Sequence, residues 1–440
     1  MSQATRILLS LVAGLLLGIL SAASGGAWVA RAVAVAEPIG GMWLDALRMT
    51  IVPLVVALLI TGIAASAEAA RASRLAGRAI VLFLIFLWTS SILAALLTPL
   101  FLQLWPLPAE SADALKAALT TSAETVGEVP GFGAFLRSIV PTNPISAAAN
   151  DAILPLILFT TVFAFAMTRL PAQPREQLTG FFRAVSEVML VMIGWVLWLA
   201  PIGVFALAYA LGSKAGAAAF GALLHYVIVV SSVGIVIWLL AYPVAVFGGR
   251  LRLLDFARAV APSQAVAIST QSSLASLPAM LRSAEALEVP VAASGVVLPL
   301  AVAVFRVTGP AMNLAVVLYV AHWFGIMPGP AQITAGVAAA ALTTLGAVSL
   351  PGQISFVTSI APIGLAMGIP VEPLILLIAV ENIPDIFRTL GNVTMDVAAT
   401  ATVARKGNFT PGENMTEEDR LLQSGAVETP KGDRARWRDS

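Results

Sequence analysis

Long apolar runs alternate with short polar stretches along most of the chain, and this pattern predicts membrane-spanning helices. The runs approach or exceed the roughly 20 residues that cross the hydrocarbon layer. They lie near 6–24, 43–66, 79–103, 152–168, 186–211, 217–247, 291–322 and 372–380. The last run reaches this length only together with the polar residues that follow it. Strand-like alternation over ten-residue units is missing. The pattern therefore predicts an all-α polytopic membrane protein.

Two segments do not fit ordinary spans. Residues 259–289 and 332–367 each carry a cluster of hydroxyl residues interrupted by proline in the middle of an apolar run. Proline and glycine there release backbone groups that hydrocarbon cannot satisfy. We expect two re-entrant helical hairpins whose tips line a polar cavity. Paired broken helices of this kind indicate a transporter site built on inverted repeats.

The segment 381–396 places three carboxylates and a guanidinium in the last apolar run. At helical spacing its polar side chains fall on one face, a stripe roughly 22 Å long at 1.5 Å per residue. They are Glu381, Asp385, Arg388, Thr389, Asn392 and Asp396. Such groups are costly at membrane depth, so we expect them to face a protein-lined cavity that handles a charged substrate.

Composition excludes several classes of protein and site. Hydrophobic residues make up 59% of the chain, charged residues 11%, and the mean hydropathy is +0.91. The net charge of +1 gives no reason to expect a nucleic-acid partner. Without cysteine and with only 2 histidines, neither a disulfide nor a zinc site is expected, and no cofactor is predicted.

The distribution of arginine predicts the orientation. Arginines follow the second, fourth and sixth spans, whereas the connector after the third span is acidic. By the positive-inside tendency both termini are cytoplasmic, in a cytoplasmic (inner) membrane. A cleaved signal peptide is the alternative for the first run, which is long for a signal core. The tail after Arg405 is too polar to bury a core, and 405–440 is expected to be a flexible cytoplasmic extension.

Four motifs give the chain a family resemblance. They are Gly41-Met-Trp-Leu-Asp-Ala-Leu-Arg-Met-Thr-Ile-Val-Pro-Leu, Ile139-Val-Pro-Thr-Asn-Pro, Ala200-Pro-Ile-Gly-Val-Phe and, most specific, Asp385-Ile-Phe-Arg-Thr-Leu-Gly-Asn-Val-Thr-Met-Asp. The chain resembles the dicarboxylate/amino acid:cation symporter family, which has the glutamate transporter fold. The resemblance implies eight transmembrane helices plus two re-entrant hairpins, a homotrimer, and an elevator motion of a transport domain against a scaffold.

The resemblance also implies a division into domains. Residues 1–75 hold scaffold helices 1 and 2, 76–105 helix 3 of the transport domain, and 133–213 scaffold helices 4 and 5. Residues 214–404 complete the transport domain with helix 6, the first hairpin, helix 7, the second hairpin and helix 8.

Arg388 and Asp385 are the expected centre of substrate binding. A guanidinium holds a carboxylate with two parallel hydrogen bonds, and in the family the matching arginine binds the side-chain carboxylate of an acidic substrate. In the family an acid at the position of Asp385 accompanies amino acid substrates, so aspartate or glutamate is favoured over succinate or malate. The alternatives are that Arg388 extends to the interface and that the two residues only neutralise each other.

Further substrate contacts are expected from Thr389 and Asn392, from Ser272, Ser273 and Ser276 at the first hairpin tip, and from Gly352 in the second tip, Ser349 to Gln353. Helix packing is the alternative for Thr389 and Asn392. Hairpin capping is the alternative for the serines, because Leu274 interrupts the serine run usual in the family. Gln353 is bulkier than the residue that the family pattern leads us to expect at this position.

Coupling ions are expected at the buried carboxylates. Asp396 matches the family's sodium-coordinating aspartate, and Glu381 stands where aspartate is more frequent. A buried carboxylate either holds a cation or takes up a proton, so Na⁺ and H⁺ both stay open. Thr89 and Ser90 match hydroxyls near the sodium site, and their alternative role is packing.

The seventh span departs from the family. After Leu298-Pro-Leu the family carries Asn-Met-Asp-Gly-Thr, and here Phe305, Arg306 and Val307 replace the first three residues. We expect the Arg306 guanidinium to stand in for a cation and to weaken or replace sodium coupling. The alternative is that Arg306 points elsewhere and pairs with a loop carbonyl.

The sequence thus predicts a secondary active symporter of acidic amino acids, and not an enzyme. An uncoupled or proton-coupled carrier of dicarboxylates or other amino acids is the alternative. An intramembrane aspartic protease is disfavoured because Asp385 and Asp396 stand roughly 16 Å apart along the helix, too far to share a proton. A passive anion channel is disfavoured by the two expected hairpin gates.

Overall fold

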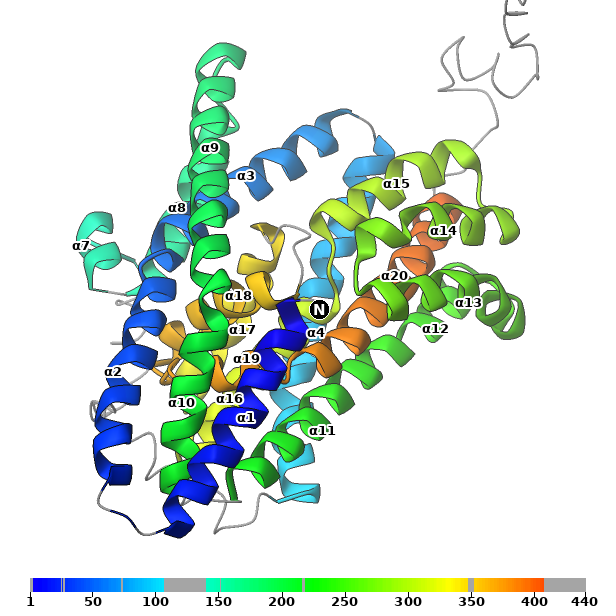
Figure 1. Ribbon diagram of the computed structural model, residues 1–440. Coiled ribbons are helices and arrows are strands. Elements are labelled where there is room, and N and C mark those ends of the chain that lie inside the picture. The colour runs from blue at the N-terminus through cyan, green and yellow to red at the C-terminus, as the bar shows by residue number, and fades with distance from the viewer. Residues whose placement is uncertain are drawn as a thin grey trace, which may run out of the picture.

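The computed structural model describes residues 3–24, 26, 28–72, 74–106, 140–150, 152–215, 218–346 and 352–406. Every regular element in these ranges is a helix (Figure 1). The first half contains α1 (Gln3–Ser24), α2 (Trp28–Arg48), α3 (Ile51–Ala72), α4 (Arg74–Leu104), α7 (Pro144–Ala149), α8 (Ile153–Met167), α9 (Ala172–Trp198) and α10 (Ala200–Ala215).

The second half begins with α11 (Ala218–Leu239), the short α12 (Ala241–Pro243) and the π-helical turn η1 (Val244–Gly248). It continues with α13 (Leu253–Thr270), α14 (Ser273–Ala286), α15 (Val291–Val304), α16 (Thr308–Trp323), α17 (Pro330–Gly346), α18 (Gly352–Met367), α19 (Leu374–Ile378) and α20 (Asn382–Lys406).

Two helix pairs stand where the hairpins were expected. In the first, α13 and α14 pack against each other and turn at Gln271, whose φ of 50° is left-handed. In the second, α17 and α18 pack against each other, but residues 347–351, which include the first part of the expected tip Ser349 to Gln353, lie outside the described residues. Each pair is followed by an interrupted helix, namely α15 and α16 after the first and α19 and α20 after the second. The repeated plan seen in the sequence is present as this order of elements.

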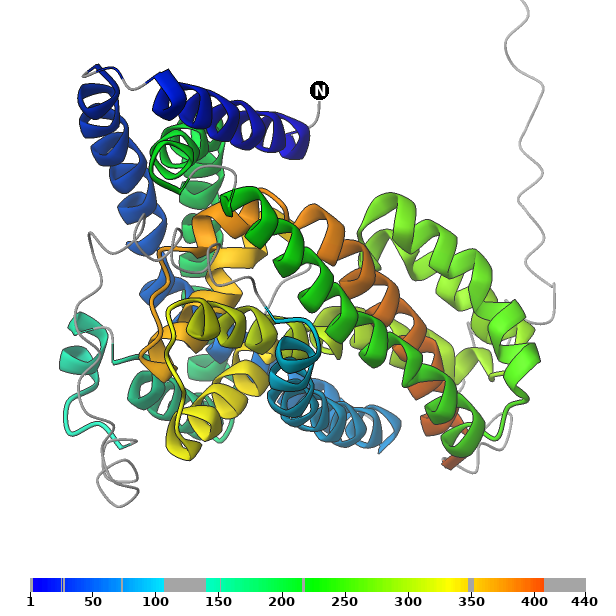
Figure 2. The same cartoon turned by 90° about the horizontal axis from the view of Figure 1, so that it is seen from below.

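Helix α20 lies in the interior of the second half (Figures 1 and 2), packed by α11, α13, α14, α15 and η1. On the other side of the molecule α1 runs beside α10, with α2 and α9 next to them. Helix α4 contacts α3, α16 and α17. The polar stripe on α20 is thereby surrounded by protein.

The contact between α1 and α10 depends on glycine. A Cβ atom at Gly18 would lie 2.4 Å from the Tyr209 carbonyl oxygen, and one at Gly212 would lie 2.5 Å from the Leu15 carbonyl oxygen. Small residues allow two helix backbones to approach this closely, which is a common way to join helices in a membrane.

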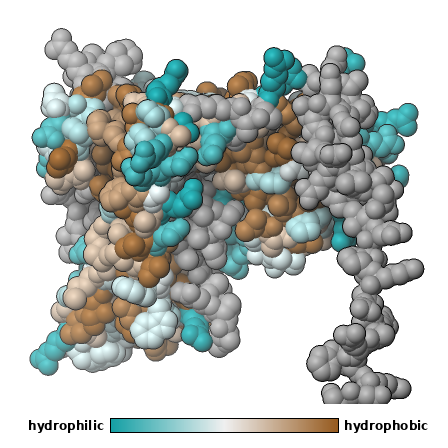
Figure 3. All heavy atoms as spheres, turned by 90° about the horizontal axis from the view of Figure 1, so that it is seen from above, coloured by the Kyte–Doolittle hydropathy of each residue, from teal (hydrophilic) through white to brown (hydrophobic). Residues whose placement is uncertain are grey.

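The surface is apolar to an extent that suits a membrane. Phe247 is 81% exposed and Trp198 is 74% exposed. In Figure 3, hydrophobic side chains cover broad areas of the described surface, and hydrophilic ones gather in patches. Within the described residues five helices or helix pairs are long and apolar enough to cross a membrane. They are Ile51–Glu68, Arg74–Leu104, Ala172–Trp198, Gly221–Gly248 and Val291–Trp323.

Two predicted span boundaries are wrong. The expected span 43–66 contains the end of α2 and the start of α3, and the expected span 186–211 contains the junction of α9 and α10. Pro53 and Pro201 lie in the first turns of α3 and α10. Proline is tolerated there because the first turn has no internal partner for its N–H. The hydropathy runs pass through both junctions because apolar residues continue on each side of them.

Candidate functional site

The site is built on α20 and the turn before it. Asp385, Thr389, Asn392 and Asp396 are buried on α20, and Glu381 is buried directly before it. The Arg388 side chain is 15% exposed. The predicted polar stripe therefore lies inside the protein, where each group must find a partner among its neighbours or bind a ligand.

The Arg388 guanidinium contacts three polar side chains. Nη2 donates to Glu381 Oε1 at 2.5 Å, and Nη1 donates to Asn313 Oδ1 at 2.6 Å. Nε lies 3.3 Å from Asp385 Oδ1, the longest of the three contacts. Arg388 is thus held in the interior, and the contact with Asp385 is the one that a competing carboxylate breaks most easily.

Glu381 is held from its other side by Tyr226. The Tyr226 hydroxyl donates to Glu381 Oε2 at 2.9 Å, and the whole tyrosine is buried on α11. Its ring makes an edge contact with Tyr319 on α16, with ring centroids 5.3 Å apart. Tyr319 in turn shares a 2.9 Å hydrogen bond with His225 Nδ1. This column of side chains fixes the position of Glu381, and hence of Arg388.

Sequence reasoning missed Asn313 and Tyr226. Both lie inside long apolar runs, at 291–322 and 217–247, which also contain other polar residues such as Arg306 and His225. Their place at membrane depth was the available signal, because a polar group there needs a partner. Nothing in the spacing along the chain indicates that Arg388 and Glu381 are those partners.

Asn392 joins α20 to the start of α16. Its Oδ1 accepts from the Thr308 backbone N–H at 3.0 Å and from the Thr308 hydroxyl at 2.7 Å. The first N–H groups of a helix lack internal partners, so Asn392 caps α16 from another helix. Its oxygen is engaged in packing, which leaves the amide nitrogen as the group for a substrate contact. Thr389 lies buried one turn before it.

The seventh span is interrupted where the sequence departs from the family. Helix α15 ends at Val304 and α16 begins at Thr308. Phe305 is buried against α4, where its ring stacks on Phe83. Arg306 is partly buried, and its positive charge acts on the carboxylates of Asp385 and Asp396. Among the described residues Arg306 makes no hydrogen bond or salt bridge.

Asp396 is the least satisfied group of the site. It is wholly buried, and neither carboxylate oxygen has a hydrogen-bond partner among the described residues. Leaving a buried carboxylate without a partner is expensive, so this position suits a cation or a proton. Within the described ranges no group of three or more histidine or acidic side chains is placed to hold a metal ion. A cation at Asp396 would need ligands of other kinds.

Thr89 and Ser90 line a nearby cavity of about 480 Å³ together with Val307 and Met395. The Thr89 hydroxyl donates to the Ile85 carbonyl at 2.7 Å, and the Ser90 hydroxyl donates to the Leu87 carbonyl at 3.0 Å. Most of the other lining residues are apolar. Each hydroxyl thus donates its hydrogen to a backbone carbonyl of its own helix. Only the oxygen lone pairs are left as possible ligands.

The first hairpin tip lies beside the start of α20. Gln271 Nε2 donates to the Asn382 carbonyl at 3.1 Å. Ser272 caps α14 by accepting from the Ala275 N–H at 3.2 Å, and the Ser276 hydroxyl donates to the Ser272 carbonyl at 2.9 Å. Ser273 is the first residue of α14. In the second pair Gly352 begins α18, while Ser349 lies outside the described residues.

The formal charges of the site nearly cancel. Glu381, Asp385 and Asp396 give −3, and Arg306 and Arg388 give +2, so the sum is −1. A ligand with two carboxylates and one ammonium would bring the sum to −2, which favours uptake of a cation or proton with it.

An all-helical membrane protein with a buried guanidinium and carboxylates beside interrupted helices belongs to the class of solute carriers. The comparison with protein families agrees. Residues 4–406 match the family described as the sodium:dicarboxylate symporter family, and the chain belongs to that family. This confirms the resemblance seen in the motifs. The family consists of transporters, so the chain is a membrane transporter and not an enzyme.

Similar proteins span nearly the whole chain. The proton/glutamate-aspartate symporter of Escherichia coli (strain K12) is 28% identical over 92% of this chain and 92% of its own length. The proton/sodium-glutamate symport protein of Bacillus subtilis (strain 168) is 28% identical over 96% of this chain and 98% of its own. The C4-dicarboxylate transport protein of Deinococcus radiodurans is 24% identical over 93% of this chain and 90% of its own.

Proposed function

We propose that this chain is a secondary active symporter that moves aspartate or glutamate across the cytoplasmic membrane. The observation that carries the proposal is the Arg388 guanidinium, held in the interior with Asp385 at 3.3 Å. A substrate that brings a distal carboxylate to Arg388 and an ammonium to Asp385 replaces this internal contact with two charge-assisted contacts. A C4-dicarboxylate supplies only the first of these.

The charges of the substrate fit this division of roles. Arg388 keeps its contacts with Glu381 and Asn313, so the guanidinium stays oriented while the Nε edge turns to the substrate. Gln271 ties the first hairpin tip to the start of α20, and this supports a contact of Ser272 and Ser273 with the α-carboxylate of the substrate. Relatives named for glutamate, aspartate and C4-dicarboxylates support the same class of substrate.

We propose that sodium coupling is weakened or replaced in this chain. Val307 supplies no carboxylate, Phe305 is committed to packing on Phe83, and the Arg306 charge acts on Asp385 and Asp396. A fixed cation near Asp396 reduces the attraction for a mobile one. Proton coupling through Glu381 or Asp396 then carries the cycle. A relative named as a proton symporter supports this, and one named for both ions keeps residual sodium binding at Asp396 open.

The architecture proposed with this function is that of the family resemblance. It comprises eight transmembrane helices, two re-entrant hairpins (α13 with α14, α17 with α18), a scaffold at 1–75 and 133–213, and a transport domain at 76–105 and 214–404 that moves as an elevator. The chain would act as a homotrimer with both termini in the cytoplasm. The packing of α13, α14 and α15 around α20 supports a transport domain that moves as one body.

Binding and uptake by the purified protein test the function. Titration calorimetry would compare aspartate, glutamate, a neutral amino acid and succinate, each with and without sodium and at several pH values. Uptake of labelled aspartate into proteoliposomes would follow under the same conditions. We expect acidic amino acids to bind best and uptake to depend on a proton gradient. Indifference to every acidic compound under all ionic conditions would contradict the proposal.

A further inference from the structure

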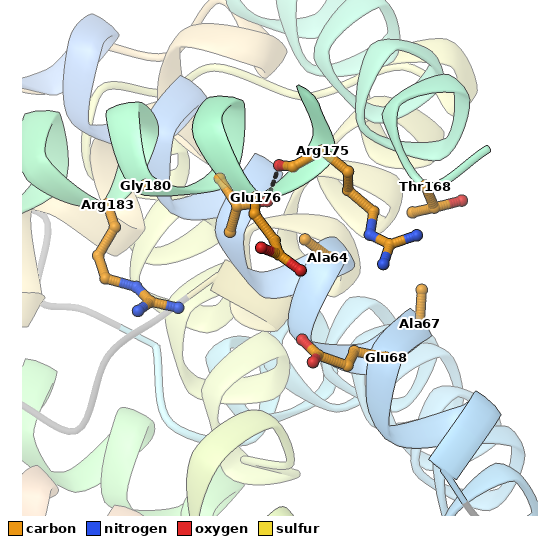
Figure 4. A pocket seen from close by; sticks show the side chains of 9 residues that line it. Ala64, Ala67, Glu68, Thr168, Arg175, Glu176, Gly180 and Arg183 are labelled. Atoms are coloured by element: carbon orange, nitrogen blue, oxygen red, sulfur yellow. Dashed lines mark hydrogen bonds between the residues drawn. The ribbon is translucent and has the colours of Figure 1, made fainter. Parts of the chain in front are cut away.

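A second charged cavity lies away from α20. It has a volume of about 560 Å³ and is lined by residues of α3, the end of α8 and the first turns of α9 (Figure 4). None of its lining residues belongs to the site around Arg388. It lies in the arginine-rich part of the chain that the sequence assigns to the cytoplasmic side.

Charges of both signs line this cavity. Glu68 comes from α3, and Arg175, Glu176 and Arg183 come from α9. In Figure 4 the two guanidiniums flank the Glu176 carboxylate, and Glu68 faces it from the neighbouring helix. The dashed line there is the bond from the Thr179 hydroxyl to the Arg175 carbonyl, 2.8 Å long.

These four charges do not neutralise one another by contact. Among the described residues no salt bridge joins any two of them, and the recorded side-chain bond of Arg175 is a long one of 3.4 Å to the Leu170 carbonyl. Opposite charges that share a cavity without pairing leave their hydrogen-bonding groups open to a ligand. The formal charges sum to zero, so the complementary ligand is a zwitterion and not a bare anion.

Beyond the cavity, the outer face of α9 becomes an apolar stripe after one acidic residue. On the face of Gly180, which lines the cavity, come the exposed Glu187 and then Val188, Val191 and Trp195, and the last three are each more than half exposed. Helix α9 is long and apolar enough to cross a membrane. A polar cavity at the head of an exposed apolar stripe matches an amphiphile, with its headgroup in the cavity and its chains along the helix.

We propose that this cavity binds the headgroup of phosphatidylethanolamine. The ammonium lies between the carboxylates of Glu68 and Glu176, and the phosphate contacts the guanidiniums of Arg175 and Arg183. A primary ammonium donates three hydrogen bonds to carboxylates, whereas the trimethylated nitrogen of phosphatidylcholine donates none. Phosphatidylglycerol has the phosphate without a cation and leaves both glutamates unpaired.

Native mass spectrometry of the delipidated full chain tests the proposal. The protein would be titrated with phosphatidylethanolamine, phosphatidylcholine and phosphatidylglycerol of the same acyl chains, and with phosphoethanolamine as the free headgroup. We expect phosphatidylethanolamine to bind about tenfold more tightly than phosphatidylcholine, the effect of about one charge-assisted hydrogen bond. Equal binding of all three lipids would overturn the proposal. Binding of phosphoethanolamine as tight as the lipid would overturn the role of the apolar stripe.

Charge variants distinguish specific binding in this cavity from nonspecific binding of lipid to the protein surface. Replacing Glu68→Gln and Glu176→Gln together leaves two guanidiniums, so the preference should move to phosphatidylglycerol. Replacing Arg175→Gln and Arg183→Gln together should lower phosphatidylethanolamine binding about tenfold or more. The matched control is Arg258→Gln, because Arg258 is an exposed arginine on α13 outside the cavity. If the control changes the preference as strongly, the site is not in this cavity.

A second copy of the chain is the competing occupant. Light scattering of the two double variants in detergent decides this point. An unchanged assembly with altered lipid preference supports the lipid site. A smaller assembly with unaltered lipid preference shows that another subunit covers the cavity and overturns the proposal. Neither measurement depends on transport, so its outcome is separate from that of the proposed function.

Discussion

The ring of Phe305 stacks on the ring of Phe83 with centroids 4.3 Å apart and planes 5° from parallel. This contact fixes the backbone between α15 and α16 against α4, directly before Arg306. A buried aromatic stack of this kind is worth about 0.5–1.5 kcal/mol beyond its area. Packing therefore anchors the segment for which the family resemblance implies sodium ligands, and Arg306 lies in this segment.

Changing this segment toward the family motif should raise sodium dependence. In the double variant Arg306→Met and Val307→Asp, one fixed cation is lost and one carboxylate is gained near Asp396, so the demand for a mobile cation rises by two charges. We expect labelled aspartate uptake to become strongly dependent on external sodium. The control Arg306→Lys keeps the charge and should behave like the parent. Parent uptake that already collapses without sodium would contradict the replacement of sodium by Arg306.

The guanidinium of Arg388 should be needed for acidic substrates in particular. Arg388→Lys keeps the positive charge but loses the planar fork that contacts Glu381, Asn313 and a substrate carboxylate together. We expect aspartate affinity to fall by about 10- to 100-fold, and neutral amino acids to change little. Calorimetry with aspartate and serine measures both. A parallel loss for serine would indicate that the variant damages the fold and not one contact.

Asp385 should increase the affinity for amino acids relative to that for dicarboxylates. Asp385→Asn removes the carboxylate that meets the substrate ammonium and keeps the size of the side chain. We expect aspartate affinity to fall by about tenfold or more, while succinate, which has no ammonium, binds as well or better. Competition of both compounds against labelled aspartate gives the ratio. An equal loss for succinate would assign Asp385 to the orientation of Arg388 instead.

The sequence was sufficient for some parts of this site and not for others. The spacing of Glu381, Asp385 and Arg388 predicts a shared helix face, because a helix places such residues on one side whatever surrounds it. The contacts of Arg388 with Asn313 and of Glu381 with Tyr226 join residues far apart in the chain. They follow from how α11, α16 and α20 pack, which periodicity does not encode. For the same reason the sequence left Asn392 open between a substrate contact and helix packing, and it did not indicate that Asn392 caps α16.

The fold, too, could be predicted from the sequence in some parts and not in others. Hydropathy and the prolines within the apolar runs predicted the helical class and the two helix pairs, since these features act locally along the chain. Hydropathy placed the ends of α2 and α9 wrongly, because Pro53 and Pro201 start new helices within continuous apolar sequence. Whether two consecutive helices continue straight or bend depends on the helices packed against them. Helix α10, for example, is packed closely against α1, which is far away in the chain.

Asp396 should cost stability when no cation is present. Its buried carboxylate has no hydrogen-bond partner among the described residues, so Asp396→Asn removes a buried charge that no hydrogen bond satisfies. We expect the cation-free variant to melt at the same or a higher temperature than the parent, and to lose any sodium-induced rise in melting temperature. Thermal unfolding in detergent with choline or sodium chloride measures this. A variant that melts well below the parent without sodium would show that Asp396 has a structural partner.

The glycines between α1 and α10 should be intolerant of even one methyl group. A Cβ at Gly18 meets the Tyr209 carbonyl at 2.4 Å, so Gly18→Ala forces the two backbones apart, at a cost of about 1–3 kcal/mol for an overpacked site. The matched control is Gly194→Ala on α9, where a Cβ meets nothing within 4 Å and alanine favours the helix by about 1 kcal/mol. Melting temperatures in detergent should therefore fall for the first variant and stay or rise for the second. Because α1 and α10 belong to the proposed scaffold, binding of aspartate to the folded fraction should be unchanged in both. A loss of binding with an unchanged melting temperature would mean that this helix pair contributes to the substrate site.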